Sequence, residues 1–409
     1  MKQCRRRGRN AVSTFNQAAN KQKKALMKIN SIKVYHVFLP FAVYFPHSLR
    51  NRSGVHNVVV EIIAEEGKIK GYGEGAPRSY VTGESLETVN RSISLFAQDK
   101  FFPWQINEIS QIWDFIDSLP DDRTHNSAIC ALESGLLDAW GRHQNQNVLH
   151  YFPKNYFTNT FSYGAALPLA DKKGVLKVSR LIKGRGINKL KLKLGKDFNE
   201  NKFILELVHS SFRNHYELKV DVNCVWDSDT VKTHLPLLQK YGVKILEQPV
   251  KPGDPQIAEI GQLAKISGLL LMADESACTL ADVQKLSQEG IYRMVNVRLS
   301  KCGGFWRSLK IIDYLRKNDI AFQVGCHLGE SGLLSAAGRV LCLLCGDALY
   351  YDGSYDEFLL MENTTFEDVS FGRGGEAHPL YGAGLGVNVD FESIRRLSNG
   401  MSIMSLSRP

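Results

Sequence analysis

The 409-residue sequence lacks any apolar run approaching the ~20 residues that a helix needs to cross a bilayer. Its N-terminal stretch also lacks the apolar segment of a secretory signal. These absences argue against a helical membrane protein, and we expect no membrane partner. Hydrophobic residues nevertheless make up 44% of the chain, which is enough for a substantial core and for more than one domain.

Cysteine is sparse, with eight residues scattered along the chain. Cys342 and Cys345 form the single C-x-x-C pair of the sequence, without a second pair of ligands. Several of the others lie in apolar or helical-looking surroundings. This pattern argues against zinc sites and disulfides and favours buried thiols in a reducing compartment, so we expect a cytoplasmic protein.

Acidic residues are absent from residues 1–30, which hold nine of the 51 lysines and arginines. The other 42 basic residues balance the 42 acidic ones, so the net charge of +9 comes from this leader. Either translation begins at Met27, where MKINSIKVYHVFLPF opens like a first strand, or residues 1–30 are a disordered targeting segment or nucleic-acid arm. The balanced remainder argues against nucleic acid as the main partner.

Two kinds of pattern divide the rest of the chain. Residues 31–100 show strands and turns, with a turn at Glu66-Gly67, and residues 101–155 are helical, so we expect an α+β first domain over residues 31–155. Strand-like and helical runs alternate from residue 159 onward, and the expected strands are TFSYGAAL, INKLKLKLG, YELKVDVNC, VKILEQP, LLLMADES, YRMVNVRLS, IAFQVGCHL and ALYYDGS. Eight strand–helix units predict a (β/α)8 barrel over residues 156–370, with residues 371–409 returning to the first domain.

Polar residues stand at the ends of the predicted barrel strands at steps of 24 to 29 positions, one strand–helix unit each: Lys193, Asp221, Glu247, Asp274, Arg298, His327 and Asp352. Active sites of such barrels lie at the carboxyl ends of the strands, so these residues are predicted to converge. Alternation makes Asp221, Glu247 and Asp274 the last inward residues of three consecutive apolar strands. Oxygen ligands without a nearby thiolate or histidine pair suit one Mg²⁺ ion.

The strand INKLKLKLG places Lys189, Lys191 and Lys193 on one face. Lys193, nearest the mouth, is the candidate base, because a neighbouring cation such as Lys191 favours the neutral amine. Lys189 lies deepest, and we expect it in a salt-bridge ladder lower in the barrel. A base beside Mg²⁺ suits removal of a proton α to a carboxylate, with the ion stabilising the enediolate as it forms.

Five segments together resemble the muconate-lactonizing subgroup of the enolase superfamily: KLKLG (191–195), DVNCVW (221–226), LEQPV (246–250), ADES (273–276) and RLSKCGG (298–304). GYGEGAPRSYVTGES (71–85) resembles the capping domain of that subgroup, and the likeness extends from about residue 30 to the C-terminus. Each segment alone is weak, but five in the family order and at barrel spacing are specific.

The resemblance implies a role for each matching residue. Asp221, Glu247 and Asp274 would bind Mg²⁺, Lys193 would be the acid/base on the second strand and Lys191 its electrostatic helper. Asn223 and Glu330 would support the metal and the small carboxylate substrate. The capping loops near residues 47–53 and 80–83, the latter including Tyr80, would close over the mouth and exclude water.

The sixth strand departs from the family pattern. Many members carry a second lysine there, and two opposed bases give racemisation or epimerisation. In VNVRLSKCGG, alternation puts Asn296, Arg298 and Ser300 on one face, so Arg298 takes that position and Lys301 falls on the other face or in the loop. Arginine is a poor base but binds carboxylates well, so Arg298 at this position favours one-base chemistry such as elimination, dehydration or cycloisomerisation. If the loop instead brings Lys301 inward, two bases are present and epimerisation is expected.

The seventh and eighth strands bear on substrate choice. Dipeptide epimerases of this subgroup carry Asp-x-Asp on the eighth strand to hold the substrate ammonium, and the matching stretch here is Asp352-Gly353-Ser354, with one carboxylate. Amino-acid or dipeptide substrates stay possible with weaker support. His327 either contacts the substrate or is a structural hydrogen-bonding partner beside Glu330.

The favoured hypothesis is a Mg²⁺-dependent dipeptide or amino-acid-derivative epimerase, followed by a one-base cycloisomerase or lyase of the dehydratase or o-succinylbenzoate-synthase kind. A nucleic-acid-binding protein that uses its basic leader on an inactive barrel, and a barrel that binds a ligand without turnover, are the alternatives. Large capped barrels often associate, so a homo-oligomer is also possible.

Overall fold

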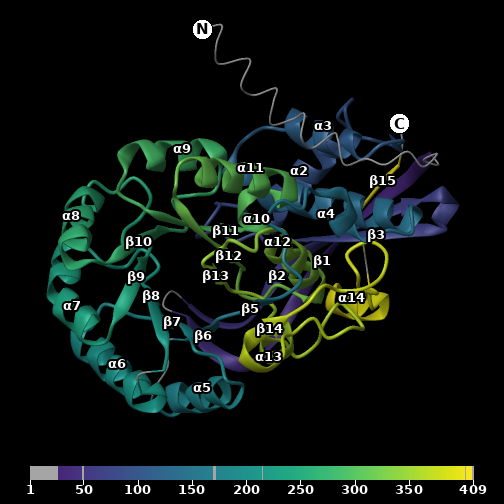
Figure 1. Ribbon diagram of the computed structural model, residues 1–409. Helices are drawn as coiled ribbons and strands as arrows, with labels where there is room; N and C mark the ends of the chain where they lie inside the picture. The colour runs from purple at the N-terminus through teal and green to yellow at the C-terminus, as the bar shows by residue number, and fades with distance from the viewer. Residues whose placement is uncertain (1–25, 48–49, 169–171, 214, 401, 408–409) are drawn as a thin grey trace, which may run out of the picture.

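The computed structural model describes residues 26–407, except residues 48–49, 169–171, 214 and 401. A ring of parallel strands surrounded by helices lies beside an antiparallel sheet that has its own helices (Figure 1). Residues 1–25 of the basic leader and part of the expected loop at residues 47–53 lie outside the described residues. Within the described range, no helix combines the length and the apolarity needed for a membrane crossing.

The antiparallel sheet has the strand order β15-β1-β2-β3, with β4 paired to β1. The strands are β1 (Met27–His47), β2 (Arg50–Ala64), β3 (Ile69–Gly75), β4 (Gln105–Ile106) and β15 (Met404–Ser407). The turn expected at Glu66-Gly67 is a short 3₁₀ helix between β2 and β3. Strand β15 pairs with β1, which joins the C-terminal segment to the first part of the chain.

The helices beside this sheet are α2 (Leu86–Ala97), α3 (Ser110–Ser118), α4 (Asn126–His143) and α14 (Phe391–Leu397), with 3₁₀ turns η3 (Arg123–His125) and η4 (Val148–Tyr151). Helix α4 lies directly against β3, because the alternate glycines of GYGEG leave room for it. A Cβ atom at Gly73 would stand 2.1 Å from the carbonyl oxygen of Ala131, so only glycine permits this approach.

Helix α2 lies where the sequence pattern predicted only strands and turns, so the prediction was wrong there. Ser85 accepts a hydrogen bond from the Thr88 N–H at 3.2 Å, and the Thr88 hydroxyl accepts one from the Ser85 N–H at 2.9 Å. This is a capping box, which satisfies two backbone donors at the start of the helix. The spacing of the two hydroxyl residues was the available sequence signal.

The predicted barrel is confirmed as an eight-stranded parallel sheet within the described residues. Its strands are β6 (Ala165–Leu167), β7 (Lys189–Lys193), β8 (Glu217–Asp221), β9 (Val243–Glu247), β10 (Leu270–Ala273), β11 (Met294–Arg298), β12 (Ala321–Gly325) and β13 (Tyr350–Tyr351). The helices between and after them are α5 (Lys172–Gly184), α6 (Phe198–Phe212), α7 (Ser228–Lys240), α8 (Ile257–Ser267), α9 (Leu280–Glu289), α10 (Leu299–Cys302), α11 (Gly304–Lys317), α12 (Gly332–Leu344) and α13 (Asp356–Leu359).

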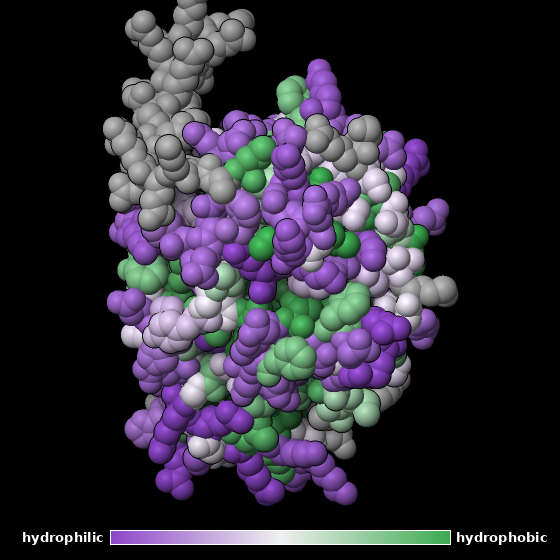
Figure 2. Space-filling view, turned by 90° about the vertical axis from the view of Figure 1, so that its right-hand side faces the viewer, coloured by the Kyte–Doolittle hydropathy of each residue, from purple (hydrophilic) through white to green (hydrophobic). Residues whose placement is uncertain are grey.

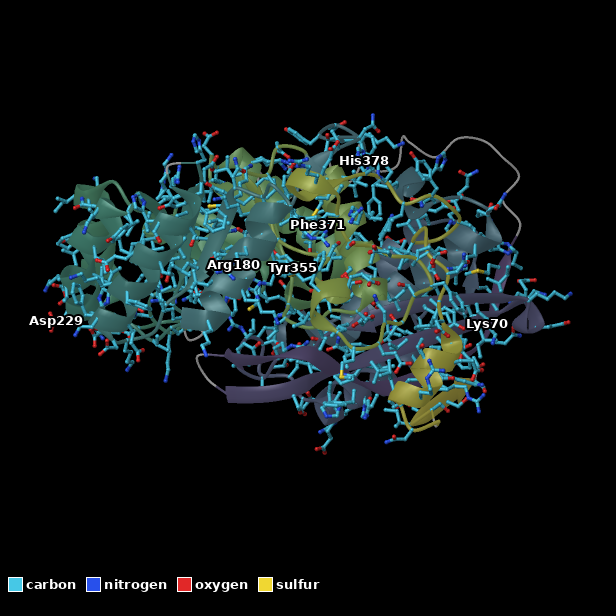
Figure 3. The ribbon with its side chains drawn as sticks, turned by 90° about the horizontal axis from the view of Figure 1, so that it is seen from below. Lys70, Arg180, Asp229, Tyr355, Phe371 and His378 are labelled. Atoms are coloured by element: carbon cyan, nitrogen blue, oxygen red, sulfur yellow. The ribbon has the colours of Figure 1, made fainter. Side chains whose placement is uncertain are left out.

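The first expected strand, TFSYGAAL, is split in two. Its start is β5 (Phe161–Ser162), which pairs with β14 (Glu376–Ala377) outside the barrel, and its end is β6. Between them the Gly164 N–H donates to the Tyr351 carbonyl at 2.8 Å, which joins the two ends of the barrel sheet. The Tyr355 hydroxyl donates to the Gly164 carbonyl at 2.8 Å, and Figure 3 shows Tyr355 beside Phe371 of the C-terminal segment.

The two parts of the molecule are joined by buried carboxylates at the N-termini of barrel helices. Glu74 of β3 accepts hydrogen bonds from the N–H groups of Ser331 and Leu334 at 3.1 and 3.0 Å, at the start of α12. Glu133 of α4 accepts the N–H of Trp306 at 2.9 Å at the start of α11. Helix N-termini favour such anions, so these contacts hold the loops before α11 and α12 against the sheet domain.

Hydrophobic residues of both parts form one continuous core, and a smaller cluster of Ile245, Met272 and Met294 fills the barrel interior. The surface in Figure 2 is mainly hydrophilic, with small hydrophobic patches between polar side chains.

Candidate active site

The lysines of β7 lie at three depths in the barrel. Lys193, at the carboxyl end, donates to Asp221 Oδ2 at 2.8 Å and also to Asn223 Oδ1. Lys191, one step lower, lies 3.0 Å from Asp352 Oδ2 and 3.7 Å from Glu247 Oε2. Although burial opposes its charge, these two acids raise the pKa of Lys191, so it is a permanent cation beside Lys193.

Lys189 does not join the expected salt-bridge ladder. Its Nζ atom lies over the ring of Tyr350, 5.4 Å from the centroid, and no ion pair of Lys189 occurs among the described residues. Lys219, from β8, instead supplies a deep ion pair to Asp352 at 3.0 Å.

The three predicted carboxylates end adjacent parallel strands. Asp221 is the last residue of β8 and lies opposite Glu247, the last residue of β9, while Asp274 directly follows β10. All three side chains are buried. Burial raises the pKa of Glu247, and the negative charge of Asp221 raises it further. The pKa of Asp274 is lowered despite burial, because Arg298 and Lys301 lie beside its carboxylate.

The carboxylate oxygens of Asp221, Glu247 and Asp274 are hard ligands of the kind that a divalent ion such as Mg²⁺ prefers. In the present arrangement each carboxylate is paired with a cation, and the described residues contain no three acidic, histidine or cysteine side chains gathered tightly enough to ligate one ion. Two buried carboxylate oxygens at this site, Glu247 Oε2 and Glu275 Oε2, nevertheless accept no hydrogen bond from the part of the chain that the structure describes. Such oxygens are costly to bury unless a cation satisfies them, and an oxygen-only group of this kind is typical of Mg²⁺ sites.

The sixth barrel strand ends at Arg298, whose guanidinium contacts Asp274 and lies 3.6 Å from Glu247. Lys301 lies in the short helix α10 and is 0% exposed. Its Nζ donates to the Asp274 carbonyl at 2.7 Å, to Asp274 Oδ1 at 3.0 Å and to the Asn296 carbonyl. Arg298 therefore contacts two of the carboxylates, whereas the fully buried Lys301 contacts Asp274 alone of the three.

Ser300 does not share the face of Arg298, because the strand ends before it. Its hydroxyl accepts the Ala76 N–H at 2.8 Å and lies 3.2 Å from the Ser127 hydroxyl, both in the sheet domain. The expectation that alternation continues to Ser300 was wrong for this reason.

The seventh strand brings His327 and Glu330 to the mouth, where both are buried. Among the described residues, neither ring nitrogen of His327 finds a hydrogen-bond partner, and the Glu330 carboxylate accepts the His327 backbone N–H at 2.6 Å. His327 therefore contacts Glu330 through its backbone and not through its imidazole. Burial and the nearby Arg298 hold the pKa of His327 well below its ordinary value, and burial raises the pKa of Glu330 to about 8.

Asp352 and Ser354 lie in the segment that directly follows β13, the eighth barrel strand. Asp352 Oδ2 is approached by Lys191 and Lys219, each at 3.0 Å, and by Gln323 Nε2 at 3.1 Å. Ser354 donates to the Tyr163 hydroxyl at 3.2 Å and, together with His327 and Glu330, lines a small cavity.

The sheet domain forms one side of the mouth. Arg78 donates to the Leu328 carbonyl at 2.7 Å, and Asn57 donates to the Gly329 carbonyl at 2.8 Å, so both hold the loop that carries His327. Tyr80 lies in the turn after β3 and is partly exposed.

Sequence reasoning missed two groups at this site. Lys219 stands two positions before Asp221 on the same strand, and alternation in YELKVDVNC was a sufficient signal for it. Glu275 lies after the end of β10, so the alternation of side chains along a strand does not predict which way it points. Its Oε1 accepts Asn223 Nδ2 at 3.4 Å, and burial raises its pKa to about 8.

The barrel, its capping sheet domain and the ring of lysines and carboxylates at the mouth define a capped (β/α)8-barrel enzyme. Residues 175–394, more than half of the chain, match the family described as enolase C-terminal domain-like. The chain belongs to this family and thus to the enolase superfamily, as its motifs predicted.

Three relatives illustrate the likeness. The N-succinyl-L-Arg/Lys racemase of Bacillus cereus is 27% identical over 76% of this chain and 83% of its own. Its crystal structure covers 92% of this chain and 99% of that chain, at 24% identity and a TM-score of 0.79.

The dipeptide epimerase of Enterococcus faecalis, in a complex with Mg and the dipeptide L-Leu-L-Tyr, aligns with a TM-score of 0.77 at 23% identity, covering 88% and 99% of the two chains. A muconate lactonizing enzyme of Pseudomonas fluorescens, complexed with muconolactone, aligns with a TM-score of 0.79 at 21% sequence identity. The alignment covers 92% of this chain and 100% of that chain. At these identities the structural likeness shows the fold alone.

Proposed function

We propose that the protein is a Mg²⁺-dependent enzyme that removes the proton α to a carboxylate of a small substrate. Asp221, Glu247 and Asp274 would hold the ion. When bound, the ion supplies positive charge that stabilises the negative charge developing on the substrate carboxylate. The observation that carries the proposal is the position of Lys193, hydrogen-bonded at the edge of three buried carboxylates that end adjacent strands.

Lys193 is the proposed base. Its amine would take the α proton, and the charged Lys191 lies one step lower on the same strand face. Asn223 and Glu275 support the same edge of the site through their mutual hydrogen bond. Arg78 and Asn57 hold the seventh-strand loop in place and help to exclude water from the reacting carbon.

The geometry favours a one-base outcome, namely cycloisomerisation or elimination. Arg298 is the cation nearest the carboxylates on the sixth strand, and arginine stays charged and clamps carboxylates rather than accepting protons. Lys301 makes three hydrogen bonds in a fully buried position, which suits a structural role. Epimerisation is the second candidate, supported by the names of the racemase and epimerase relatives.

Isotope exchange separates these outcomes. Candidate N-acylamino acids, dipeptides and unsaturated diacids are incubated with the Mg²⁺-loaded protein in D₂O and followed by NMR. Exchange with retention, or an alkene or lactone product, supports one-base chemistry, and exchange with inversion supports epimerisation. The K193Q variant is expected to lose about 10²–10⁴-fold in rate. The matched control is K189Q, on the same strand face but in contact with the Tyr350 ring, and it is expected to keep its activity.

We also propose that the protein works in a reducing compartment such as the cytoplasm, because its cysteines form no disulfides within the described residues. All seven cysteines in the described part of the chain are free thiols, and most of them are buried. Binding to nucleic acid would have to depend on the leader, and salt-dependent binding that disappears on removal of residues 1–25 would support that alternative.

A further inference from the structure

Helix α5 carries an uncompensated positive charge on the outside of the barrel. Its sequence KKGVLKVSRLIKG contains five basic residues and no acidic one. All five basic side chains are exposed, and they belong to Lys172, Lys173, Lys177, Arg180 and Lys183. No ion pair of these side chains occurs among the residues that the structure describes.

The five basic side chains share one face of the helix, called the cationic face below. With 3.6 residues per turn, they fall within an arc of about 140°. The other side of the helix is buried through Val175, Ser179 and Ile182. Helix α5 lies at the lower edge of the molecule in Figure 1, so the view from below in Figure 3 looks onto this side, where Arg180 is labelled. The cationic face is therefore open to the solvent.

The neighbouring elements do not neutralise the cationic face. Arg185 directly follows α5, and the exposed side chain of Arg373 lies beside Gly186, so both add positive charge at the end of the helix. Helix α6 packs against α5 and has two acidic residues, Glu200 and Glu206. These two acids are fewer than the five cations of α5, so the surface of the two helices together stays positive.

Two large apolar side chains are exposed beside these cations. Leu181 of α5 is 54% exposed and Phe203 of α6 is 43% exposed. Lys172 Nζ lies 5.9 Å from the centroid of the Phe203 ring, so an ammonium group and an aromatic ring stand side by side. This combination suits an anionic lipid surface, because ammonium groups stay at the level of the phosphates while apolar side chains enter the headgroup boundary.

We propose that the cationic face of α5 binds the headgroups of an anionic phospholipid membrane, with Leu181 and Phe203 entering the headgroup layer. Clusters of lysine and arginine are attracted to the anionic lipids of a cytoplasmic leaflet. This surface contact needs no spanning helix, and it revises the expectation of no membrane partner. The five cations make none of the contacts of the candidate active site, so the inference does not depend on the proposed function.

Nucleic acid is the rival anionic partner, and the composition of the cationic face disfavours it. Four of the five cations are lysines, which act as point charges, whereas the reading of bases relies on arginine, asparagine and glutamine. An exposed leucine gains no stabilisation from a phosphate backbone. It does gain from leaving water at a lipid boundary.

Vesicle sedimentation of the full-length protein tests the lipid contact. One set of vesicles contains phosphatidylcholine alone, and the other contains phosphatidylcholine and phosphatidylserine in a three-to-one ratio. We expect at least about tenfold stronger binding to the vesicles with phosphatidylserine, and a steep loss of binding as the salt concentration rises. Equal binding to both sets, or binding to neither, overturns the inference.

Charge reversal on α5 locates the contact. K177E/R180E is expected to weaken binding to the phosphatidylserine vesicles at least about tenfold. The matched control K265E/R293E changes the net charge equally, on exposed residues of α8 and of the turn before β11, and is expected to bind like the wild type. L181S/F203S keeps every charge and is expected to bind at least about threefold more weakly. All these positions are exposed, and thermal unfolding measured by circular dichroism checks that each variant folds.

Three further outcomes would overturn the inference. Wild-type binding by K177E/R180E assigns the lipid contact to another part of the chain, such as the basic leader. An equal loss in K265E/R293E shows an effect of net charge alone. Binding to duplex RNA without binding to vesicles, abolished in K177E/R180E, assigns the cationic face to nucleic acid instead.

Discussion

Replacing Lys301 with methionine tests whether this lysine is structural or is a second base. The change keeps the length of the side chain, so it leaves little cavity. It removes the donor to the Asp274 and Asn296 carbonyls and one of the two cations beside the Asp274 carboxylate. Breaking a buried ion pair costs about 3–5 kcal/mol, and each buried acceptor left without a donor costs about 1–3 kcal/mol.

Because Arg298 still neutralises Asp274, the cost of an unpaired buried charge falls away, and we expect the two carbonyl acceptors alone to cost about 2–6 kcal/mol in total. Urea unfolding followed by tryptophan fluorescence gives the apparent free energy of unfolding. The control is K310M, which removes the exposed pair between Lys310 and Asp117 and is expected to cost less than about 1 kcal/mol. A K301M protein that unfolds like the wild type but no longer exchanges the α proton would refute the structural role and make Lys301 the second base.

Further predictions concern the mouth and its supports. In R298K we expect α-proton exchange with inversion of configuration, because a lysine at this position can act as a base opposite Lys193. Chiral chromatography of the recovered substrate measures the configuration. If the substrate still exchanges with retention of configuration, the one-base explanation is contradicted. Chelation with EDTA is expected to abolish α-proton exchange, and added Mg²⁺ to restore it, whereas activity that survives chelation argues against a metal-dependent reaction. Burial raises the pKa of Glu84 to about 7, so its contribution to stability is full below its unfolded value near 4.5 and is lost as the pH rises through 7. Unfolding midpoints measured from pH 5 to 8 are therefore expected to fall more for the wild type than for E84Q, and parallel pH profiles would contradict this.

The barrel and the positions of its polar residues were predictable because both depend on local periodicity. Alternation in strands of five residues and a repeat of one strand–helix unit are visible in the sequence, and they placed Lys193, Asp221 and Glu247 at strand ends, where the structure has them. The inward position of Arg298 followed from the same rule. Where a strand stopped early, as at Ser300, the rule failed, because a helix began at Leu299.

Contacts between distant strands were beyond such reasoning. Lys219 and Asp352 are 133 positions apart, and Lys301 of α10 meets Asp274 across 27 positions of the chain. The interdomain contacts of Glu74 and Glu133 likewise join segments more than 170 positions apart. No local pattern encodes which cation pairs with which acid, since that depends on the closure of the barrel and on the space left inside it.

The sequence by itself determined the class of this protein: the alternation of strands and helices, the family motifs and the residue types at the mouth are all local properties. Only the tertiary structure decided how those charges are shared, with Asp352 held by two lysines, Arg298 in contact with two of the carboxylates and Lys301 buried against Asp274. The physical reason is that electrostatic pairing in a buried site depends on distances of a few ångströms between residues far apart in the chain. Folding of the whole barrel sets those distances.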